Sequence, residues 1–225
     1  MGSKRCPKKS LKKIQDKSVI EIVIKRLSKA KKLSHIIVAI PDTKKDIPLK
    51  KFLIKKNIKF FSGSENNLID RFASTIDHYN LNNFSHFIRV TADNVFIDHN
   101  EIDRIINYSL KKKLIFCSHI NSTFPERNND FSGEVYNIKK FKKINLMRLS
   151  PFVREHIYPY FFKLKSRKIR RLEVNKNLVS NIKFDLDYKD DLSFFKKIGK
   201  KYKKSIFNIP NKELIKLGNK IKKDV

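Results

Sequence analysis

The sequence is poor in cysteine and glycine, and it lacks a long apolar run. Its 225 residues include two cysteines, Cys6 and Cys117, and five glycines. Two such distant cysteines are too few for a disulfide framework or a four-ligand zinc site. No apolar run approaches the roughly 20 residues that a membrane span needs, and no signal-peptide core opens the chain. These absences argue against a disulfide-stapled secreted protein and a membrane-spanning one, and we expect a protein of the reducing cytoplasm.

Acidic residues are also scarce relative to basic ones. The chain has 52 Lys and Arg against 22 Asp and Glu, which gives a formal net charge of +30. Such a charge often indicates nucleic acid or an anionic membrane as the partner. Here the lysines are spread from end to end, so we interpret the charge as a compositional bias. We expect salt-sensitive, non-specific contacts with polyanions and no specific nucleic-acid binding.

The chain does have enough apolar residues, 40% of the sequence, for one packed domain. Apolar stripes with helical period predict helices at 18–31, 49–56, 67–79, 101–110 and 211–221. Short β-branched runs predict buried strands at 35–40, 58–61, 87–91 and 114–118. This alternation, with short connections, predicts an α/β fold: a Rossmann-like, mostly parallel sheet flanked by helices on both faces.

Ligands of such sheets bind beyond the carboxyl ends of the strands. Asp42, Ser64 and Asp93 each follow a predicted strand closely, so we expect them at one edge of the sheet. Two interpretations of Asp93 stay open, since an acid in this position is either a turn or helix cap or a metal ligand.

The opening residues combine small and basic side chains. Gly2 and Ser3 let an anion approach backbone N–H groups, and Arg5 and Lys9 add positive charge. The pattern fits a cradle for a nucleotide triphosphate, although it is not a Walker motif because G-x-x-x-x-G-K-[ST] is absent. The alternative interpretation is a solvated basic tail.

Seven segments carry a family resemblance by their order: MGSKRCPKKSL, IIVAIPD, FFSGSENNLIDRF, RVTADNVFID, SGEVYNIKKF, VREHIYPYF and FDLDYKDDLSFFKKI. The set resembles the family of acylneuraminate and 3-deoxy-manno-octulosonate cytidylyltransferases, and most closely its SpsF-type branch of spore coat polysaccharide biosynthesis. The resemblance implies a single nucleotidyltransferase domain over residues 1–225, with a fold like that of nucleotide-diphospho-sugar transferases. It also implies transfer of CMP from CTP to a sugar acid or related sugar, with release of pyrophosphate.

The resemblance further implies roles for the residues that match the motifs. Those expected at the nucleotide are Gly2, Ser3, Arg5, Lys9, Asp42, Ser64 and Arg71. Among them Arg5 and Lys9 are the expected catalytic residues, with Lys9 as the main stabiliser of charge. Asp93 and Asp187 are expected to hold Mg²⁺, a cation that takes one or two carboxylates and keeps several waters. Such a transfer depends on positioning and charge neutralisation and needs no covalent intermediate.

On the acceptor side, the resemblance implies that Glu134, Arg154 and His156 bind the substrate, and it leaves the exact role of the Arg-Glu-His segment open. A region around 119–165 is expected to form a small arm that closes over the sugar and contributes to a homodimer. His119 and His156 are candidate general bases, although a lone histidine is more often structural.

Two departures from the family pattern affect these expectations. The family has an apolar strand before the Met-Gly-Ser turn, in the middle of the sheet, whereas this sequence begins at Met1. We therefore expect the sheet to lack its first strand and translation to start upstream; a chain complete at Met1 would be poorly stable and weakly active. The second departure is drift at the substrate positions, which leaves the sugar undefined.

Two other functions stay open. Asp185-Leu186-Asp187 is a D-x-D motif, which could hold the metal of a nucleotide sugar in a glycosyltransferase. A non-enzymatic basic protein that binds nucleic acid is the second alternative, and its affinity would fall steeply with salt. The sequence also leaves open the preference for cytosine over uracil and the oligomeric state.

Overall fold

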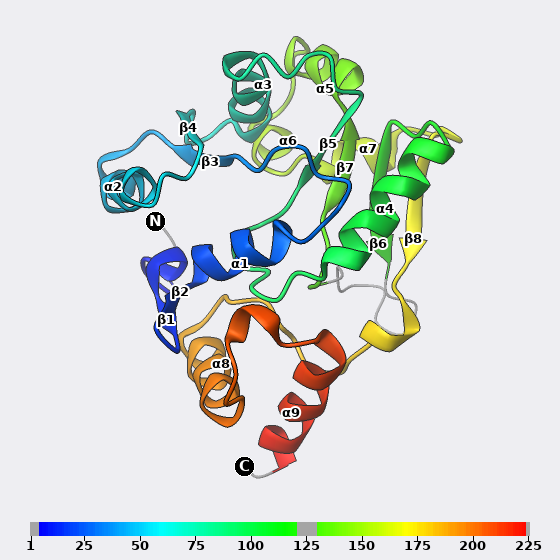
Figure 1. Cartoon of the computed structure of the whole chain (residues 1–225). Coiled ribbons are helices and arrows are strands. Elements are labelled where there is room, and N and C mark those ends of the chain that lie inside the picture. Colours follow the sequence, from blue (N-terminus) through cyan, green and yellow to red (C-terminus); the bar gives the residue numbers. More distant parts are fainter. Residues whose placement is uncertain (1–4, 121–129, 224–225) are drawn as a thin grey trace.

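The computed structural model of the chain describes residues 5–120 and 130–223 (Figure 1). Its strands are β1 (Lys13–Ile14), β2 (Lys17–Ser18), β3 (Val38–Pro41), β4 (Phe60–Gly63), β5 (His86–Arg89), β6 (Phe116–Ile120), β7 (Glu134–Asn137) and β8 (Ile169–Glu173). The larger sheet has the order β5–β7–β6–β8, and two small sheets pair β3 with β4 and β1 with β2. In the larger sheet β5, β6 and β8 run in one direction and β7 runs against them, while β3 and β4 are parallel. The predicted α/β architecture is confirmed, with one antiparallel strand inside the sheet.

Helices cover both faces of the larger sheet (Figure 1). They are α1 (Val19–Leu27), α2 (Ile47–Lys55), α3 (Leu68–His78), α4 (His99–Lys111), α5 (Ile138–Asn145), α6 (Pro151–Glu155), α7 (Tyr158–Lys163), α8 (Lys189–Lys201) and α9 (Asn211–Lys223). On one face, α1 and α4 pack around Cys117, and on the other, α3, α5 and α7 pack around Phe116. Successive residues of β6 are therefore buried on opposite faces. No helix in the described parts of the chain combines the length and apolar character needed to cross a bilayer.

The two ends of the chain share one apolar cluster. Cys6 and Ile14 are buried in it together with Phe195 of α8 and Leu214 of α9. Gln15 strengthens the contact, since its amide donates to the carbonyl oxygen of Gly199 at 3.0 Å. Residues 5–14 thus belong to the folded domain, and the interpretation of this segment as a solvated tail was wrong.

The observed elements differ in places from the predicted ones. β3 begins at Val38, three residues later than expected, because its register with β4 starts at the pair Val38–Phe60. The region 119–165, expected as an arm, contributes β7 to the interior of the larger sheet. Sequence alone missed this strand because its four residues carry too short a pattern to distinguish a strand from a loop.

A cavity of about 280 Å³ separates β3 from β5. Its lining is mainly apolar and includes Val38, Ala39, Ile88 and Val90. Within the described residues, the edge of β3 that faces away from β4 carries no strand partner, and the same holds for the edge of β5 that faces away from β7.

Candidate active site

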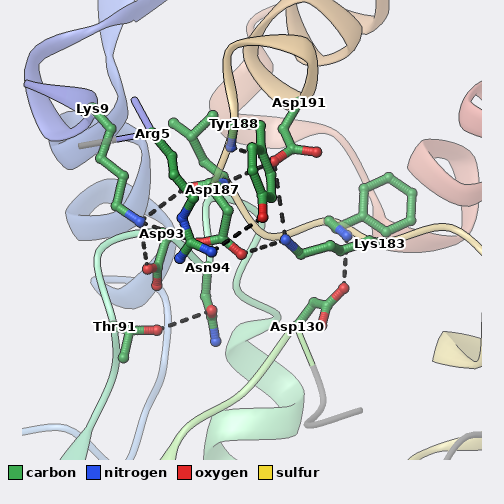
Figure 2. Close-up of polar contacts among 12 residues, drawn as sticks. Arg5, Lys9, Thr91, Asp93, Asn94, Asp130, Lys183, Asp187, Tyr188 and Asp191 are labelled. Carbon is green, nitrogen blue, oxygen red and sulfur yellow. Dashed lines mark hydrogen bonds and ion pairs between the residues drawn. The ribbon is translucent and has the colours of Figure 1, made fainter. Parts of the chain in front are cut away.

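Three segments that are far apart in the sequence meet beyond the carboxyl end of β5 (Figure 2). Lys9 begins a single 3-10 turn, Asp93 follows β5, and Asp187 stands just before α8. A backbone hydrogen bond joins the last two segments, since Leu186 N–H donates to the carbonyl oxygen of Asp93 at 3.0 Å. This contact holds both carboxylates beside the N-terminal turn.

The Lys9 ammonium lies between the two carboxylates. Its Nζ is 2.7 Å from Oδ2 of Asp93 and 3.4 Å from Oδ1 of Asp187, and it donates to the Leu186 carbonyl oxygen at 2.9 Å. The three side chains are 20% to 27% exposed, so a ligand can reach them. Two carboxylates converging on one cation form a site that suits positive charge.

This pair of carboxylates fits Mg²⁺ but not a metal caged by protein alone. In residues 5–120 and 130–223, no group of three or more His, Cys, Asp and Glu side chains is arranged to hold a metal ion. Mg²⁺ needs only one or two carboxylates, because waters and substrate phosphates complete its octahedral shell. Asp93 and Asp187 meet that requirement.

A second lysine also holds Asp187. Lys183 forms an ion pair with the carboxylate and lies 4.0 Å from Asp191. Burial raises the pKa of Asp187, but the hydrogen bond and charge of Lys183, together with Lys9, outweigh it and lower the pKa below its usual value. Asp191 in turn accepts hydrogen bonds from the backbone N–H groups of Asp187 and Tyr188, which fixes the start of α8.

Arg5 approaches the same place from the N-terminal side. Its guanidinium donates to the Tyr188 hydroxyl at 3.2 Å and lies 5.0 Å from the centre of the Tyr188 ring. Both side chains are exposed. Arg5 therefore stands at the rim of the site, where it can reach an anionic ligand.

Asp185 is a partly buried acid next to Asp93 and Asp187. Burial raises its pKa to about 8, with further contributions from the charges of Asp130 and Asp93. It forms an isolated antiparallel bridge with Asn94. The two acids of the D-x-D motif thus differ in their ionisation: Asp187 shares a cation with Asp93, while Asp185 favours its neutral form.

A cavity of about 210 Å³ adjoins the carboxylates and is lined by Arg89 and Glu134 as well as Asp93. Glu134 binds Arg89 at 2.8 Å and accepts a hydrogen bond from the Tyr136 hydroxyl at 2.6 Å. Gly133 lies in the same wall, where a Cβ atom would collide with the carbonyl oxygen of Arg89. Glycine at position 133 is therefore required for the close approach of this wall to β5.

Two residues expected at the nucleotide occupy the neighbouring strand ends, and a third, Arg71, lies in α3. Asp42 follows β3, and its N–H donates to Gly63 at 2.8 Å, while Ser64 follows β4. Arg71 donates to the Ser64 carbonyl oxygen. Burial lowers the pKa of Arg71, and the nearby positive charge of Arg89 lowers it further. Arg71 and Arg89 both line the neighbouring cavity of about 280 Å³ between β3 and β5.

Other expected site residues lie elsewhere. Gly2 and Ser3 fall outside the described residues. Arg154 donates to the Met147 carbonyl oxygen at 2.9 Å, and the exposed His156 packs against Phe152. Neither side chain lines the cavity beside Asp93, so the structure does not bring them to this site.

The sequence interpretation missed several polar residues of the site. Lys183 pairs with Asp187, the Tyr188 hydroxyl accepts a hydrogen bond from Arg5, and Asp130 accepts the N–H of Phe184 at 2.6 Å. One signal was present for Lys183, which stands four residues before Asp187.

The chain has clear relatives. A sequence profile of the family described as "Cytidylyltransferase" matches residues 1–214. An uncharacterised protein of Methanocaldococcus jannaschii is 32% identical over 164 residues, which are 72% of this chain and 63% of that protein. The spore coat polysaccharide biosynthesis protein SpsF of Bacillus subtilis is 27% identical over 165 residues, or 71% of this chain and 65% of SpsF. The chain thus matches just under two thirds of the length of these curated relatives.

Solved structures share the fold. A cytidylyltransferase from Leptospira borgpetersenii superposes with a TM-score of 0.85 at 22% identity and covers 99% of this chain and 92% of its own. CMP:2-keto-3-deoxy-manno-octonic acid synthetase complexed with CTP gives a TM-score of 0.63 at 14% identity, with coverage of 89% and 95%. At identities of 22% and 14%, the similarity to these structures shows a shared fold and no more.

Proposed function

The chain belongs to the cytidylyltransferase family, and on that premise we propose that it transfers CMP from CTP to a sugar acid or a related sugar and releases pyrophosphate. In this reaction a hydroxyl oxygen of the acceptor forms a bond to the α-phosphorus, and the bond from that phosphorus to the bridging oxygen of pyrophosphate breaks. The CTP in the related synthetase structure supports the choice of nucleotide.

The observation that carries the proposal is the position of Lys9 between Asp93 and Asp187. An ammonium group there can contact the nucleotide phosphates and neutralise the oxygens that gain charge as pyrophosphate departs. Asp93 and Asp187 would then hold Mg²⁺, which supplies positive charge to the phosphate oxygens when it is bound. Arg5, at the rim, adds a charge-assisted donor to the triphosphate.

The acceptor would enter the cavity lined by Arg89 and Glu134. We expect Asp42 and Ser64 to contact the nucleotide from the adjoining strand ends and Arg71 to contact it from α3, with Gly2 and Ser3 completing the triphosphate contacts. Similarity to SpsF supports a product used in surface polysaccharide synthesis. We place the reaction in the cytoplasm, where CTP is available.

A homodimer is the oligomeric state that we propose. Exposed large apolar side chains gather on the α5–α7 segment, where Leu146 is 87% exposed and Phe152 is 61% exposed. A second copy could cover these side chains. Light scattering that gives the mass of one chain at micromolar concentration would contradict this.

The function is tested by incubating the protein with CTP, Mg²⁺ and a panel of sugar acids and neutral sugars, and measuring pyrophosphate. We expect release with CTP and an accepted sugar, and less release with UTP, ATP or GTP. A glycosyltransferase would instead release a nucleotide from a nucleotide sugar and no pyrophosphate from CTP. The absence of pyrophosphate with every sugar and nucleotide would overturn the proposal.

Lys9→Ala tests the role of the ammonium group directly. We expect pyrophosphate release to fall by roughly a hundredfold or more, because a preorganised charge facing the transferring phosphate is lost. Lys142→Ala is the matched control, since it also removes a lysine from an ion pair, with Asp77, but on the exposed surface. Equal rates for the two variants would contradict the role of Lys9.

A further inference from the structure

The Glu101–His119 pair is a polar arrangement that the reaction described so far does not use. His119 lies near the end of β6, and Glu101 lies in the first turn of α4, the helix that covers this face of the sheet. Alternation along β6 puts His119 on the same face as Cys117, which belongs to the cluster under α4. The strand and the helix thus bring a carboxylate and an imidazole together in the interior.

Glu101 fixes the orientation of the imidazole ring. Its Oε1 is 2.9 Å from Nε2 of His119, and both side chains are 2% exposed. Arg104 holds the same carboxylate through Nε at 2.8 Å and a second contact through Nη2. Nη2 of Arg104 also lies 3.3 Å from Nε2, but its two hydrogens go to Glu101 Oε1 and to the Glu173 carbonyl oxygen. The carboxylate has no proton to give, so Nε2 of His119 carries the hydrogen and donates to it.

The tautomer leaves the other ring nitrogen as an acceptor. Burial lowers the pKa of His119, so the ring is neutral near pH 7 and Nδ1 carries a lone pair. Nδ1 has no hydrogen-bond partner among the described residues, and the same holds for Oγ of Ser132, which is 1% exposed. Oδ1 of Asp185, in the same lining, is also without a partner in the described parts of the chain. Buried polar atoms are nearly always paired, so three unpaired ones at one cavity point to an occupant that is missing from the protein alone.

Both residues line the 210 Å³ cavity that also contains Asp93. We infer that His119 and Ser132 bind hydroxyl groups of the acceptor sugar, with Nδ1 of His119 accepting a hydrogen bond from one hydroxyl and Glu101 acting as the positioning residue for the ring. The inference rests on the proposed function, and it assigns the acceptor to polyhydroxylated molecules that present a hydroxyl donor at this wall. Arg89, the cation in the described lining, is already paired with Glu134, so recognition here depends on hydroxyl groups rather than on an acceptor carboxylate.

The test compares His119→Gln with His119→Asn in the full chain. The longer amide reaches the Nε2 position and keeps the contact with Glu101, whereas the shorter amide reaches the Nδ1 position. We expect His119→Gln and Ser132→Ala to raise the KM for the acceptor about tenfold each, the loss expected for one hydrogen bond to a buried polar group. His119→Asn is expected to recover part of that loss, and the KM for CTP stays within about twofold throughout.

Monodeoxy analogues of the accepted sugar identify the hydroxyl. One analogue should raise the acceptor KM of the wild type about tenfold and leave that of His119→Gln unchanged, because the variant already lacks the ring nitrogen that accepts from this hydroxyl. The matched control is His86→Gln on β5, whose Nε2 contacts the Leu114 carbonyl oxygen at 2.7 Å outside this cavity; it should leave both KM values unchanged. Melting temperatures check that each variant folds.

Three results separate the inference from the function on which it rests. If His119→Gln releases pyrophosphate with an unchanged KM for the acceptor, the inference fails and the proposed function stands. The same holds if every analogue raises the KM of wild type and variant by the same factor. The occupant of the cavity would then be water. If no sugar supports pyrophosphate release, the proposed function fails. Calorimetry with each sugar of the panel alone then tests the inference. Equal binding to wild type and His119→Gln, or binding to neither, would overturn it.

Discussion

The two ends of the cavity beside Asp93 satisfy their polar groups in different ways. At one end, Lys9 and Lys183 surround Asp93 and Asp187, so each of the two carboxylates has at least one cationic partner. At the other end, Glu101 is fully paired, but Nδ1 of His119 and Oγ of Ser132 have no partner among the described residues. The carboxylates at the first end can exchange one cationic partner for another, whereas the unpaired atoms at the second end need a hydrogen-bond partner.

This difference separates two tasks that the proposed reaction requires. A cluster of partly exposed lysines and carboxylates can exchange its internal ion pairs for contacts with phosphate and metal charges, which suits charge stabilisation during transfer. A buried hydrogen-bond acceptor with a fixed orientation, such as Nδ1 of His119, cannot change its direction and suits recognition of one hydroxyl position. We therefore expect variants of the first end to change the rate and variants of the second to change the affinity for the acceptor.

Asp93→Asn is expected to give the largest effect. It tests whether the Asp93 end of the cavity controls the rate rather than the affinity for the acceptor. The amide keeps the size of the side chain but removes the charge that would hold Mg²⁺ opposite Asp187. We expect kcat for pyrophosphate release to fall between roughly a hundredfold and a thousandfold, with the KM for the acceptor little changed. Asp77→Asn, in the surface pair with Lys142, is the control that should leave the rate intact. A rise in acceptor KM without loss of rate would place Asp93 in recognition instead.

How much of this contrast could be predicted from sequence depends on the distance between partners along the chain. Lys9, Asp93 and Asp187 were identifiable because each lies in a local motif with a family match, and Asp93 also follows a predicted strand. The partnership of His119 with Glu101 was not, since it arises from the packing of α4 on β6 and no local pattern marks it. Arg154 and His156 belong to a motif whose place in the fold was not predicted. Arg154 lies on α6 and His156 directly follows it, and α6 packs against α3. The sheet order was also beyond sequence, because the pairing of β7 with both β5 and β6 is non-local.

Glu101→Gln gives the second prediction, which concerns stability and its dependence on pH. Burial raises the pKa of Glu101, but hydrogen bonds from Arg104 and His119 outweigh it and bring the pKa down from 4.5 to about 2. A carboxylate with a lowered pKa stabilises the fold fully above its unfolded pKa, and this contribution is lost as the pH falls from 4.5 towards 2. The shift corresponds to up to about 3 kcal/mol of unfolding free energy at neutral pH.

We therefore expect the difference in unfolding free energy between wild type and Glu101→Gln to be largest at pH 7 and to shrink between pH 5 and pH 2. Urea denaturation at several pH values measures it. Glu155→Gln, at an exposed position on α6, is the control that should show no such trend. A difference that is independent of pH would mean that Glu101 contributes through shape rather than charge, and would remove the basis for the fixed tautomer of His119.

Tyr188→Phe should have the smallest effect and sharpens the picture of the exposed rim. The change removes the hydroxyl that accepts from Arg5 at 3.2 Å but keeps the ring 5.0 Å from the guanidinium. Because both groups are exposed and the contact of the cation with the ring remains, we expect the KM for CTP to change by only about twofold, with kcat and the acceptor KM unaffected. Arg5→Ala serves as the comparison, since it removes the charge itself and should weaken CTP binding by clearly more. If Tyr188→Phe weakened CTP binding as much as Arg5→Ala, the hydroxyl would be the group that orients Arg5 towards the triphosphate, and the rim would be as preorganised as the buried end.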